Sequence, residues 1–232
     1  MANSKLSLKF FKTIFFISIF VLATSSLIAF YIMGNIERNT QEQIKNSIDI
    51  KLQNKINSSF KIGVTNAVSI ASNNQLIESL KQNNKNKAYN ILNKLEKNYH
   101  NLASQKETKI HIHTADVKSF MRSWDKNHNG DELSSFRHTI NKVKDTNKTV
   151  LNIEIGWADL VIRAIVPIIQ NNKYLGSLEF LQDFNEIQKS LENEKKYLLT
   201  LIDIKLLKNK AKSDQIIDKY ALVQREFNNN FF

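Results

Sequence analysis

The first long pattern in the chain is an apolar run of 21 residues, Thr13–Met33, that contains no charged residue. This length suffices for a helix to cross a hydrocarbon core of roughly 30 Å. Three lysines precede the run, and positive charge on one flank predicts that this flank stays in the cytoplasm. We therefore expect a cytoplasmic N-terminus over 1–12, a transmembrane helix over 13–33, and the rest of the chain beyond the membrane.

A cleaved signal peptide is the alternative interpretation of this run. Ala23-Thr24-Ser25 is a possible small-residue cleavage site. However, the apolar run continues to Met33, which exceeds the roughly 7 to 15 residues usual for the apolar part of a signal peptide. The preferred interpretation is an uncleaved anchor.

An apolar residue recurs every four positions beyond the anchor, a spacing typical of one helix face. The series consists of Ile44, Ile48, Leu52, Ile56, Phe60, Val64 and Val68. It predicts a long helix from 35 to about 82, and a second helical segment follows at 87–104 after a polar break. We interpret the region 34–104 as a helical stalk. Its apolar stripe is either a dimer seam or a face that packs against the chain's own sheet.

The pattern then changes to the alternation of polar and apolar residues that is typical of strands. Four segments show strand-like character: 109–114, 149–155, 160–169 and 173–181. An amphipathic helix is expected over Leu133–Lys144, and short turns join the last three strands, which predicts antiparallel pairing. The fold class is therefore α+β, with a PAS-like antiparallel sheet module over 105–182. A linker helix and an incomplete second module are expected over 183–232.

Composition narrows the possible functions. The chain has no cysteine, so a disulfide framework and a thiolate metal site are excluded. Its formal charge of +11 comes mostly from scattered lysines, and we find no basic run with interleaved aromatics of the kind that binds nucleic acid. We therefore expect no nucleic-acid partner, although the positive charge favours anionic ligands.

An ordered set of motifs in the middle of the chain resembles the double-Cache periplasmic sensor domain. The motifs are His111–Asp116, Ser119–Trp124, Gly130–Arg137, Ile153–Gly156, Ile162–Ile168 and Leu175–Phe180. The resemblance covers roughly 35–230. It implies a periplasmic ligand-binding domain held between two membrane helices and followed by a cytoplasmic signalling region, as in methyl-accepting chemotaxis receptors and sensor kinases. It also implies a homodimer. Because the second sensory subdomain is incomplete, we expect a truncated chain.

Three of the five arginines fall close together in this module: Arg122, Arg137 and Arg163. A guanidinium group binds carboxylate or phosphate through a fixed fork of donors that lysine lacks. We hypothesise that the three side chains point toward one pocket and hold a small anionic ligand, with Trp124 as a wall and Asp131 as a further polar contact. The alternative is that each arginine pairs with a carboxylate such as Asp131, Glu154 or Glu179 and ties helix to sheet.

The strand 160–169 sharpens this hypothesis. Arg163 shares a strand face with Val161 and Ile165, and a charge on an apolar face needs a partner. Glu154 on the neighbouring strand is expected to face the same pocket, so it is either a ligand-binding residue or simply the ion-pair partner of Arg163.

Two further motifs suggest metals, and we interpret both without them. His111 and His113 share a strand face, but spacing fixes no third ligand beside them, so ordinary sheet-face histidines are expected. The loop 125–130 copies the start of a calcium loop, but Phe136 stands where the twelfth position requires glutamate. No nucleophile triad or phosphate-binding loop is present. We therefore expect no enzyme activity, no cofactor and no metal site.

Together these features predict the ligand-sensing part of a bacterial chemoreceptor, anchored in the inner membrane with its main domain in the periplasm. Ligand binding is expected to displace the long helix, since differential affinity for two arrangements is what shifts such an equilibrium. One alternative is the sensor region of a histidine kinase or cyclic-nucleotide enzyme that has lost its catalytic part. Another is an anchored binding or scaffold protein. An amine held by Asp131, Glu154 and Glu179 also remains an alternative to the anion.

Overall fold

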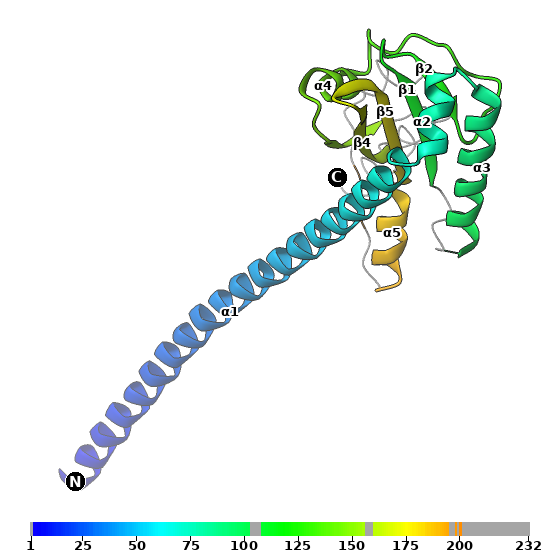
Figure 1. Ribbon diagram of the computed structural model, residues 1–232. Helices are drawn as coiled ribbons and strands as arrows, with labels where there is room; N and C mark the ends of the chain where they lie inside the picture. The colour runs from blue at the N-terminus through cyan, green and yellow to red at the C-terminus, as the bar shows by residue number, and fades with distance from the viewer. Residues whose placement is uncertain (1, 103–107, 156–159, 195–197, 199, 201–232) are drawn as a thin grey trace. The chain divides into compact units, whose positions relative to one another are not determined.

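The computed structural model describes residues 2–102, 108–155, 160–194, 198 and 200. The chain divides into two units, 1–54 and 55–232. The second unit contains every strand of the described chain and all helices but the first part of α1 (Figure 1). The second half-module predicted from residue 197 onward lies almost entirely outside the described residues.

The first unit is helical throughout its described length, as part of helix α1 (Ala2–Ala71). The apolar side chains between residues 13 and 33, such as Phe16, Leu27 and Phe30, are mostly exposed in the single chain. Among the described helices, α1 is long and apolar enough to cross a membrane. The structure therefore agrees with the helix predicted over 13–33.

The expectation of one helix from 35 to about 82 is wrong, because α1 ends at Ala71. Asn73 is the N-cap of a new helix, α2 (Asn74–Lys81), and its side-chain oxygen accepts a hydrogen bond of 3.1 Å from the Leu76 amide. Helix α3 (Lys85–Leu102) follows after a short turn. Helices α2 and α3 bury Leu76 and Leu92 against the sheet, so they belong to the sensory module rather than to a stalk.

A five-stranded antiparallel sheet forms the centre of the second unit, in the order β2-β1-β5-β4-β3. Four strands match the sequence prediction within one or two residues: β1 (Lys109–Thr114), β3 (Val150–Ile155), β4 (Leu160–Gln170) and β5 (Lys173–Asp183). The edge strand β2 (Ser119–Arg122) was not predicted. Helices combined with an antiparallel sheet confirm the predicted α+β class.

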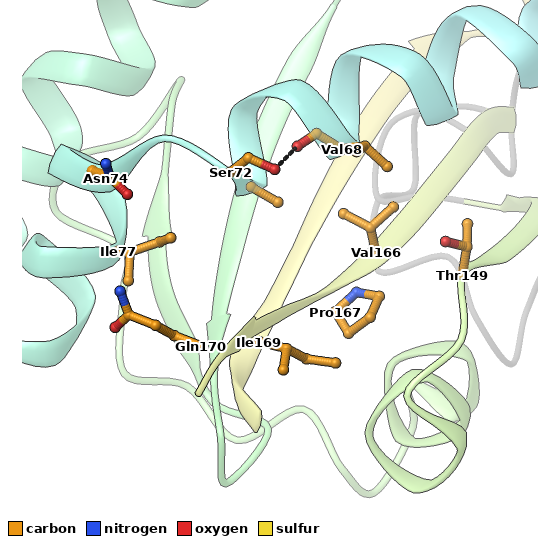
Figure 2. Close-up of a pocket in the computed structure, with 10 residues that line it drawn as sticks. Val68, Ser72, Asn74, Ile77, Thr149, Val166, Pro167, Ile169 and Gln170 are labelled. Carbon is orange, nitrogen blue, oxygen red and sulfur yellow. Dashed lines mark hydrogen bonds between the residues drawn. The ribbon is translucent and has the colours of Figure 1, made fainter. Parts of the chain in front are cut away.

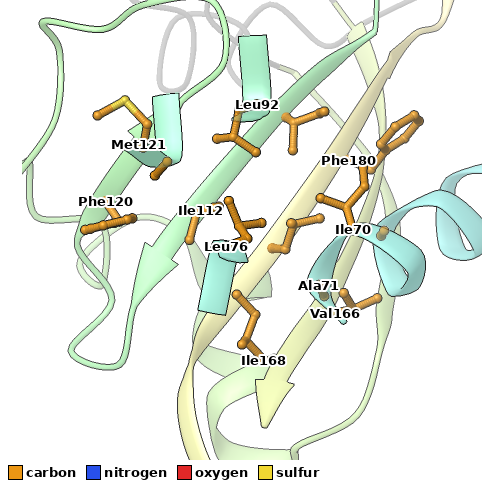
Figure 3. Packing of buried hydrophobic residues seen from close by; sticks show 14 of the residues in the cluster. Ile70, Ala71, Leu76, Leu92, Ile112, Phe120, Met121, Val166, Ile168 and Phe180 are labelled. Carbon is orange, nitrogen blue, oxygen red and sulfur yellow. The ribbon is translucent and has the colours of Figure 1, made fainter. Parts of the chain in front are cut away.

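One face of the sheet carries the main hydrophobic core, which is covered by the last turns of α1 and by α2 and α3 (Figure 3). Strand residues such as Ile112, Val166 and Phe180 pack there against Ile70 and Leu76. The apolar stripe that runs from Ile44 to Val68 has different surroundings along its length. Val64 packs against this core, as the second interpretation of the stripe predicts, whereas Ile44 and Ile48 in the first unit are exposed.

Helix α4 (His138–Thr146) packs against β3, β4 and β5 on the opposite face through Ile140 and Val143. The predicted start at Leu133 is wrong, because hydrogen bonds from the Phe136 and Arg137 amides to the Leu133 carbonyl form a turn ahead of the helix. The last described helix, α5 (Asn185–Glu192), lies within the predicted linker helix.

Candidate functional site

Polar and charged side chains gather on the face of the sheet that α4 covers, which we call the α4 face. Alternation along each strand places them on this face. In the strand register His111 lies opposite Glu179, and His113 lies opposite Ser177. All four side chains are buried. Buried polar groups on an apolar sheet must find partners within the protein, and each of these does.

Glu179 is the central acid of this site, with no exposed surface. Its Oε1 atom accepts hydrogen bonds from Arg163 Nη1 at 2.6 Å and from Arg137 Nη2 at 2.5 Å. Arg163 lies on strand β4, and Arg137 is the N-cap residue of helix α4. The two guanidinium groups therefore converge on one buried carboxylate oxygen from two different elements.

Glu154 on β3 is the second acid near these arginines. Its Oε2 atom lies 3.4 Å from Arg163 Nε and 4.0 Å from Arg137 Nε. Neither Nε donates a hydrogen bond within the part of the chain that the structure describes. The Glu154 side chain is 17% exposed, so it is the more accessible and the more loosely held of the two carboxylate partners.

Arg122 forms a separate pair on the same sheet face. Its guanidinium group donates two hydrogen bonds to the Asp131 carboxylate, at 2.9 and 2.7 Å, and a third to the His128 carbonyl. Burial alone would raise the pKa of Asp131, but the Arg122 charge and hydrogen bonds outweigh it and lower the pKa to about 2. This bidentate pair ties the edge strand β2 to the loop that follows it.

The three arginines predicted to hold one ligand do not all converge on one point in the structure. Arg122, Arg137 and Arg163 share the α4 face, but they form two groups, and each has an internal carboxylate partner. The contacts are those of the alternative interpretation, in which Asp131, Glu154 and Glu179 neutralise the arginines. The Glu154–Arg163 pair was foreseen, whereas the shared position of Arg137 and Arg163 on Glu179 was not.

Trp124 lies beside the histidines at the end of β2. Its ring stands edge to face with the His111 ring, with centroids 5.8 Å apart, and the Lys109 ammonium lies 5.7 Å from the Trp124 ring. The Trp124 side chain therefore lies next to the buried polar cluster.

The two histidines form a compact cluster with Glu179. His113 Nε2 lies 3.1 Å from His111 Nδ1, and each of these atoms lies 3.6 Å from Glu179 Oε2. Spacing along the chain indicates no third acid or histidine beside the two histidines, because Glu179 joins the cluster only through the pairing of β1 with β5. The resemblance placed β1 and β5 in one module but did not specify that they pair, and this pairing is what brings Glu179 to the histidines.

Burial sets the protonation of this cluster. It lowers the pKa of both imidazoles, well below the usual value in the case of His111. Burial opposes ionisation of Glu179 as well, but the charges of Arg137 and Arg163 prevail and hold its pKa well below the usual value. The histidines are therefore neutral and the glutamate ionised at neutral pH.

These shifts predict a specific loss of stability in mild acid. Below about pH 6.5, His111 and His113 bind protons in the unfolded chain but stay neutral in the folded chain. The free energy of unfolding therefore falls as the pH falls. The slope is at most about 1.4 kcal/mol per pH unit for each histidine. Denaturation between pH 7 and pH 5, with a chelator present, should show this slope and should show it reduced in His113→Gln. The exposed control His138→Gln should keep it, and an unchanged slope in both variants would contradict the assignment.

A cleft of about 450 Å³ opens elsewhere in the second unit, between the end of α1, α2 and the end of β4 (Figure 2). Val68, Ser72 and Asn74 line it on the helical side, and Val166 and Ile169 on the strand side. None of the six residues predicted to bind ligand lies in its lining. Its lining carries no charged side chain, in contrast to the cluster around Glu179.

The calcium-like loop is organised by its own acid. The Asp125 carboxylate accepts hydrogen bonds from the amides of Asn127 and His128, at 3.0 and 3.2 Å, the pattern of an Asx turn. Gly130 adopts a positive φ of 88° at the end of the loop, which accounts for the glycine at that position.

Comparison with known families matches residues 41–203 to the family described as "Double sensory domain of two-component sensor kinase". The match covers well over half of the chain and includes every strand of the sheet. No curated protein matches the chain in sequence.

A search of solved structures finds similar chains at low identity. The Escherichia coli DcuS sensor domain is 13% identical, with a TM-score of 0.49 over 59% of this chain and 97% of its own. The Vibrio cholerae histidine kinase DctB sensor domain is 14% identical, with a TM-score of 0.49 over 66% and 62%. The Campylobacter jejuni chemoreceptor Tlp3 sensory domain with isoleucine bound is 16% identical, with a TM-score of 0.36 over 61% and 63%. The chain thus spans less than two thirds of the DctB and Tlp3 domains.

Proposed function

Because this chain belongs to the double-Cache sensory domain family, we propose that it is the extracytoplasmic ligand-sensing part of a bacterial transmembrane chemoreceptor. Its ligand is a small anion that binds on the α4 face of the sheet, at Arg137 and Arg163. The chain acts by binding and by moving a helix, without a catalytic step and without an organic cofactor.

The observation that carries this proposal is the pair of arginines, Arg137 and Arg163, whose buried Nε atoms donate no hydrogen bond within the described chain. Such atoms are costly to leave without a partner. A small carboxylate or similar anion would supply acceptors for them in the forked geometry that guanidinium groups favour. Glu154, which lies 3.4 Å or more from both Nε atoms, is the group that such an anion would displace.

Strand β4 links this site to the end of α1. Arg163 projects from one face, and its neighbours Ile162 and Ala164 are buried on the other. On that other face Gly63 of α1 lies so close that a Cβ atom there would stand 3.1 Å from Ala164 Cβ. An anion that prefers one position of Arg163 therefore favours one position of β4 against the helix, and this differential affinity is the signal.

The same helix supports a location in the inner membrane. Its uncharged segment 13–33 serves as the anchor, the lysines before it stay in the cytoplasm, and the sensory module lies in the periplasm. Ile44 and Ile48, exposed in the single chain, form the seam of a homodimer in this proposal. No nucleic-acid partner is proposed.

A second candidate function is the sensor region of a histidine kinase. The description of the matched family names two-component sensor kinases, and this is the observation that supports the second candidate. Any residues that the gene encodes beyond Phe232 distinguish the two outputs. A long heptad-rich helical hairpin would support the chemoreceptor, and an ATP-binding signature would support the kinase.

We expect an anionic ligand to raise the melting temperature of the full chain in detergent, and Arg163→Ala to abolish this rise. A ligand at a hundred times its dissociation constant stabilises the folded state by about 2.7 kcal/mol. The screen comprises small organic acids, inorganic anions, amino acids and amines, each read out by thermal denaturation. Arg38→Ala is the matched control, since Arg38 lies in the first unit, and it should leave the response intact.

Arg163→Lys separates loss of binding from loss of folding. It keeps the charge beside Glu179 but not the fork of donors, so it should fold and still respond weakly to an anion. A melting shift with amines alone would contradict the anionic ligand and favour the acids Asp131, Glu154 and Glu179 as the binding groups. An undiminished anion response in both Arg163 variants would place the site elsewhere.

A further inference from the structure

The three buried atoms His111 Nδ1, His113 Nε2 and Glu179 Oε2 form a triangle with sides of 3.1, 3.6 and 3.6 Å. A point in their plane that is equidistant from all three lies about 2.0 Å from each, which is the bond length of zinc to imidazole nitrogen or carboxylate oxygen. Each of the three residues offers one atom of a kind that binds metal ions. The triangle therefore has the size of a metal coordination sphere.

The outer partners of the histidines hold the ligand atoms in position. His111 Nε2 lies 2.8 Å from Ser119 Oγ, and His113 Nδ1 lies 2.9 Å from Ser177 Oγ. When each outer nitrogen donates its proton to the serine, the inner nitrogen presents a lone pair. Metal-binding histidines in proteins are oriented by partners of this kind.

Hydrogen bonds also hold the Glu179 carboxylate in position. Its Oε1 atom accepts the hydrogen bonds of Arg137 and Arg163, whereas its Oε2 atom accepts none within the described chain. A buried carboxylate oxygen without a donor is costly, and a cation between Oε2 and the two imidazoles would satisfy it. Neutral imidazoles and an ionised carboxylate are also the protonation states that metal binding requires.

We propose that His111, His113 and Glu179 bind a divalent transition-metal ion of the zinc class, with a fourth position left for water or for a donor atom of a ligand. Three protein ligands with an open position are typical of zinc sites that bind exogenous groups. The proposal goes beyond the sensory function, because the metal binds whether or not Arg137 and Arg163 receive an anion.

Without a metal, the same atoms would have to share protons. One imidazole would donate to the other across the 3.1 Å contact, and Glu179 Oε2 would remain 3.6 Å from both nitrogens, beyond ordinary hydrogen-bond distance. The two arrangements differ in one measurable respect, which is whether zinc binds to the folded chain.

The experiment uses the full chain purified in detergent. Elemental mass spectrometry of the protein as isolated, and titration of the chelator-stripped protein with Zn²⁺, should each give about one tightly bound zinc per chain. His113→Ala should abolish this binding. Ser177→Ala, which removes only an outer partner, should weaken it by about 10- to 100-fold.

His138→Ala is the matched control, because its side chain is exposed outside the cluster, and it should bind zinc as the parent does. Absence of zinc in both measurements, or binding that survives His113→Ala, would overturn the metal site. The zinc measurement and the anion screen have independent outcomes. Zinc binding without any anion response would support the metal site and contradict the anionic ligand. An anion response without zinc binding would support the anionic ligand and contradict the metal site.

Discussion

Replacing Glu179 with glutamine is expected to lower the free energy of unfolding by about 3 to 5 kcal/mol, the cost of removing one partner from a buried ion pair. Glu179 has no exposed surface and accepts hydrogen bonds from both Arg137 and Arg163. The amide keeps the shape of the side chain but removes its charge. Two guanidinium groups would then share only Glu154, at 3.4 and 4.0 Å.

Chemical denaturation of the full chain in detergent measures this loss as a shift of the unfolding midpoint. Glu78→Gln is the matched control, because the Glu78–Lys81 pair has side chains 41% and 43% exposed. Exposed pairs contribute about 0 to 1 kcal/mol, so the control should unfold close to the parent. A Glu179→Gln variant that also unfolds within 1 kcal/mol or so of the parent would show that the arginines do not depend on this carboxylate.

A double variant distinguishes charge from packing. If the loss comes from uncompensated charge, Arg137→Met together with Glu179→Gln should be more stable than the sum of the two single changes predicts, since one buried cation leaves with the anion. Strict additivity would instead assign the loss to packing around the side chain.

The strands were the most predictable part of the fold. Alternation in the segment KIHIHT matches the bounds of β1, and the turn at Asn171-Asn172 joins two strands that pair as expected. Both asparagines have positive φ, which fits the preference of this residue for the left-handed region. Local chemistry alone therefore determined these features.

The helix break at Ala71 and the edge strand β2 were not predictable in the same way. The apolar spacing is interrupted at Ser72 and resumes at Leu76 and Leu80, so periodicity does not reveal that a new helix, α2, begins after the Asn73 cap. Strand β2 has only four residues, and three of them are buried, so it shows no alternation. The helix break follows from the local Asn73 cap, which apolar periodicity does not register, whereas tertiary packing decides the edge strand β2.

In the candidate site, too, local alternation predicts some features and long-range pairing decides the others. Period-two alternation was enough to place Arg163 on an otherwise apolar face and to predict that it needs a partner. Which partner it takes depends on the register of β4 with β5 and on the turn before α4 that brings Arg137 to Glu179. His111 and Glu179 are adjacent only through long-range pairing of β1 with β5, so spacing along the chain hid the third member of the cluster.

Replacing Gly176 with alanine is expected to destabilise the sensory module by about 3 to 5 kcal/mol, because strain and steric conflict add at one position. Gly176 has a φ of +153°, and a Cβ atom there would stand 2.1 Å from the His113 carbonyl oxygen. This atom belongs to the backbone of β1, which pairs with β5 at Thr114 and Gly176. Relief therefore requires the two strands to separate locally.

Thermal denaturation should show a decrease of at least about 6 °C in the melting temperature of Gly176→Ala. Gly34→Ala should leave the melting of the sensory module unchanged, since nothing lies within 4 Å of the Cβ position at Gly34. Separation of β1 from β5 would also move His113 away from Ser177 and Glu179, so zinc affinity should fall together with stability. A Gly176→Ala variant that melts like the parent would show that the two strands do not approach this closely. One that melts early but binds zinc as tightly as the parent would show that the His113–Glu179 geometry is independent of this contact.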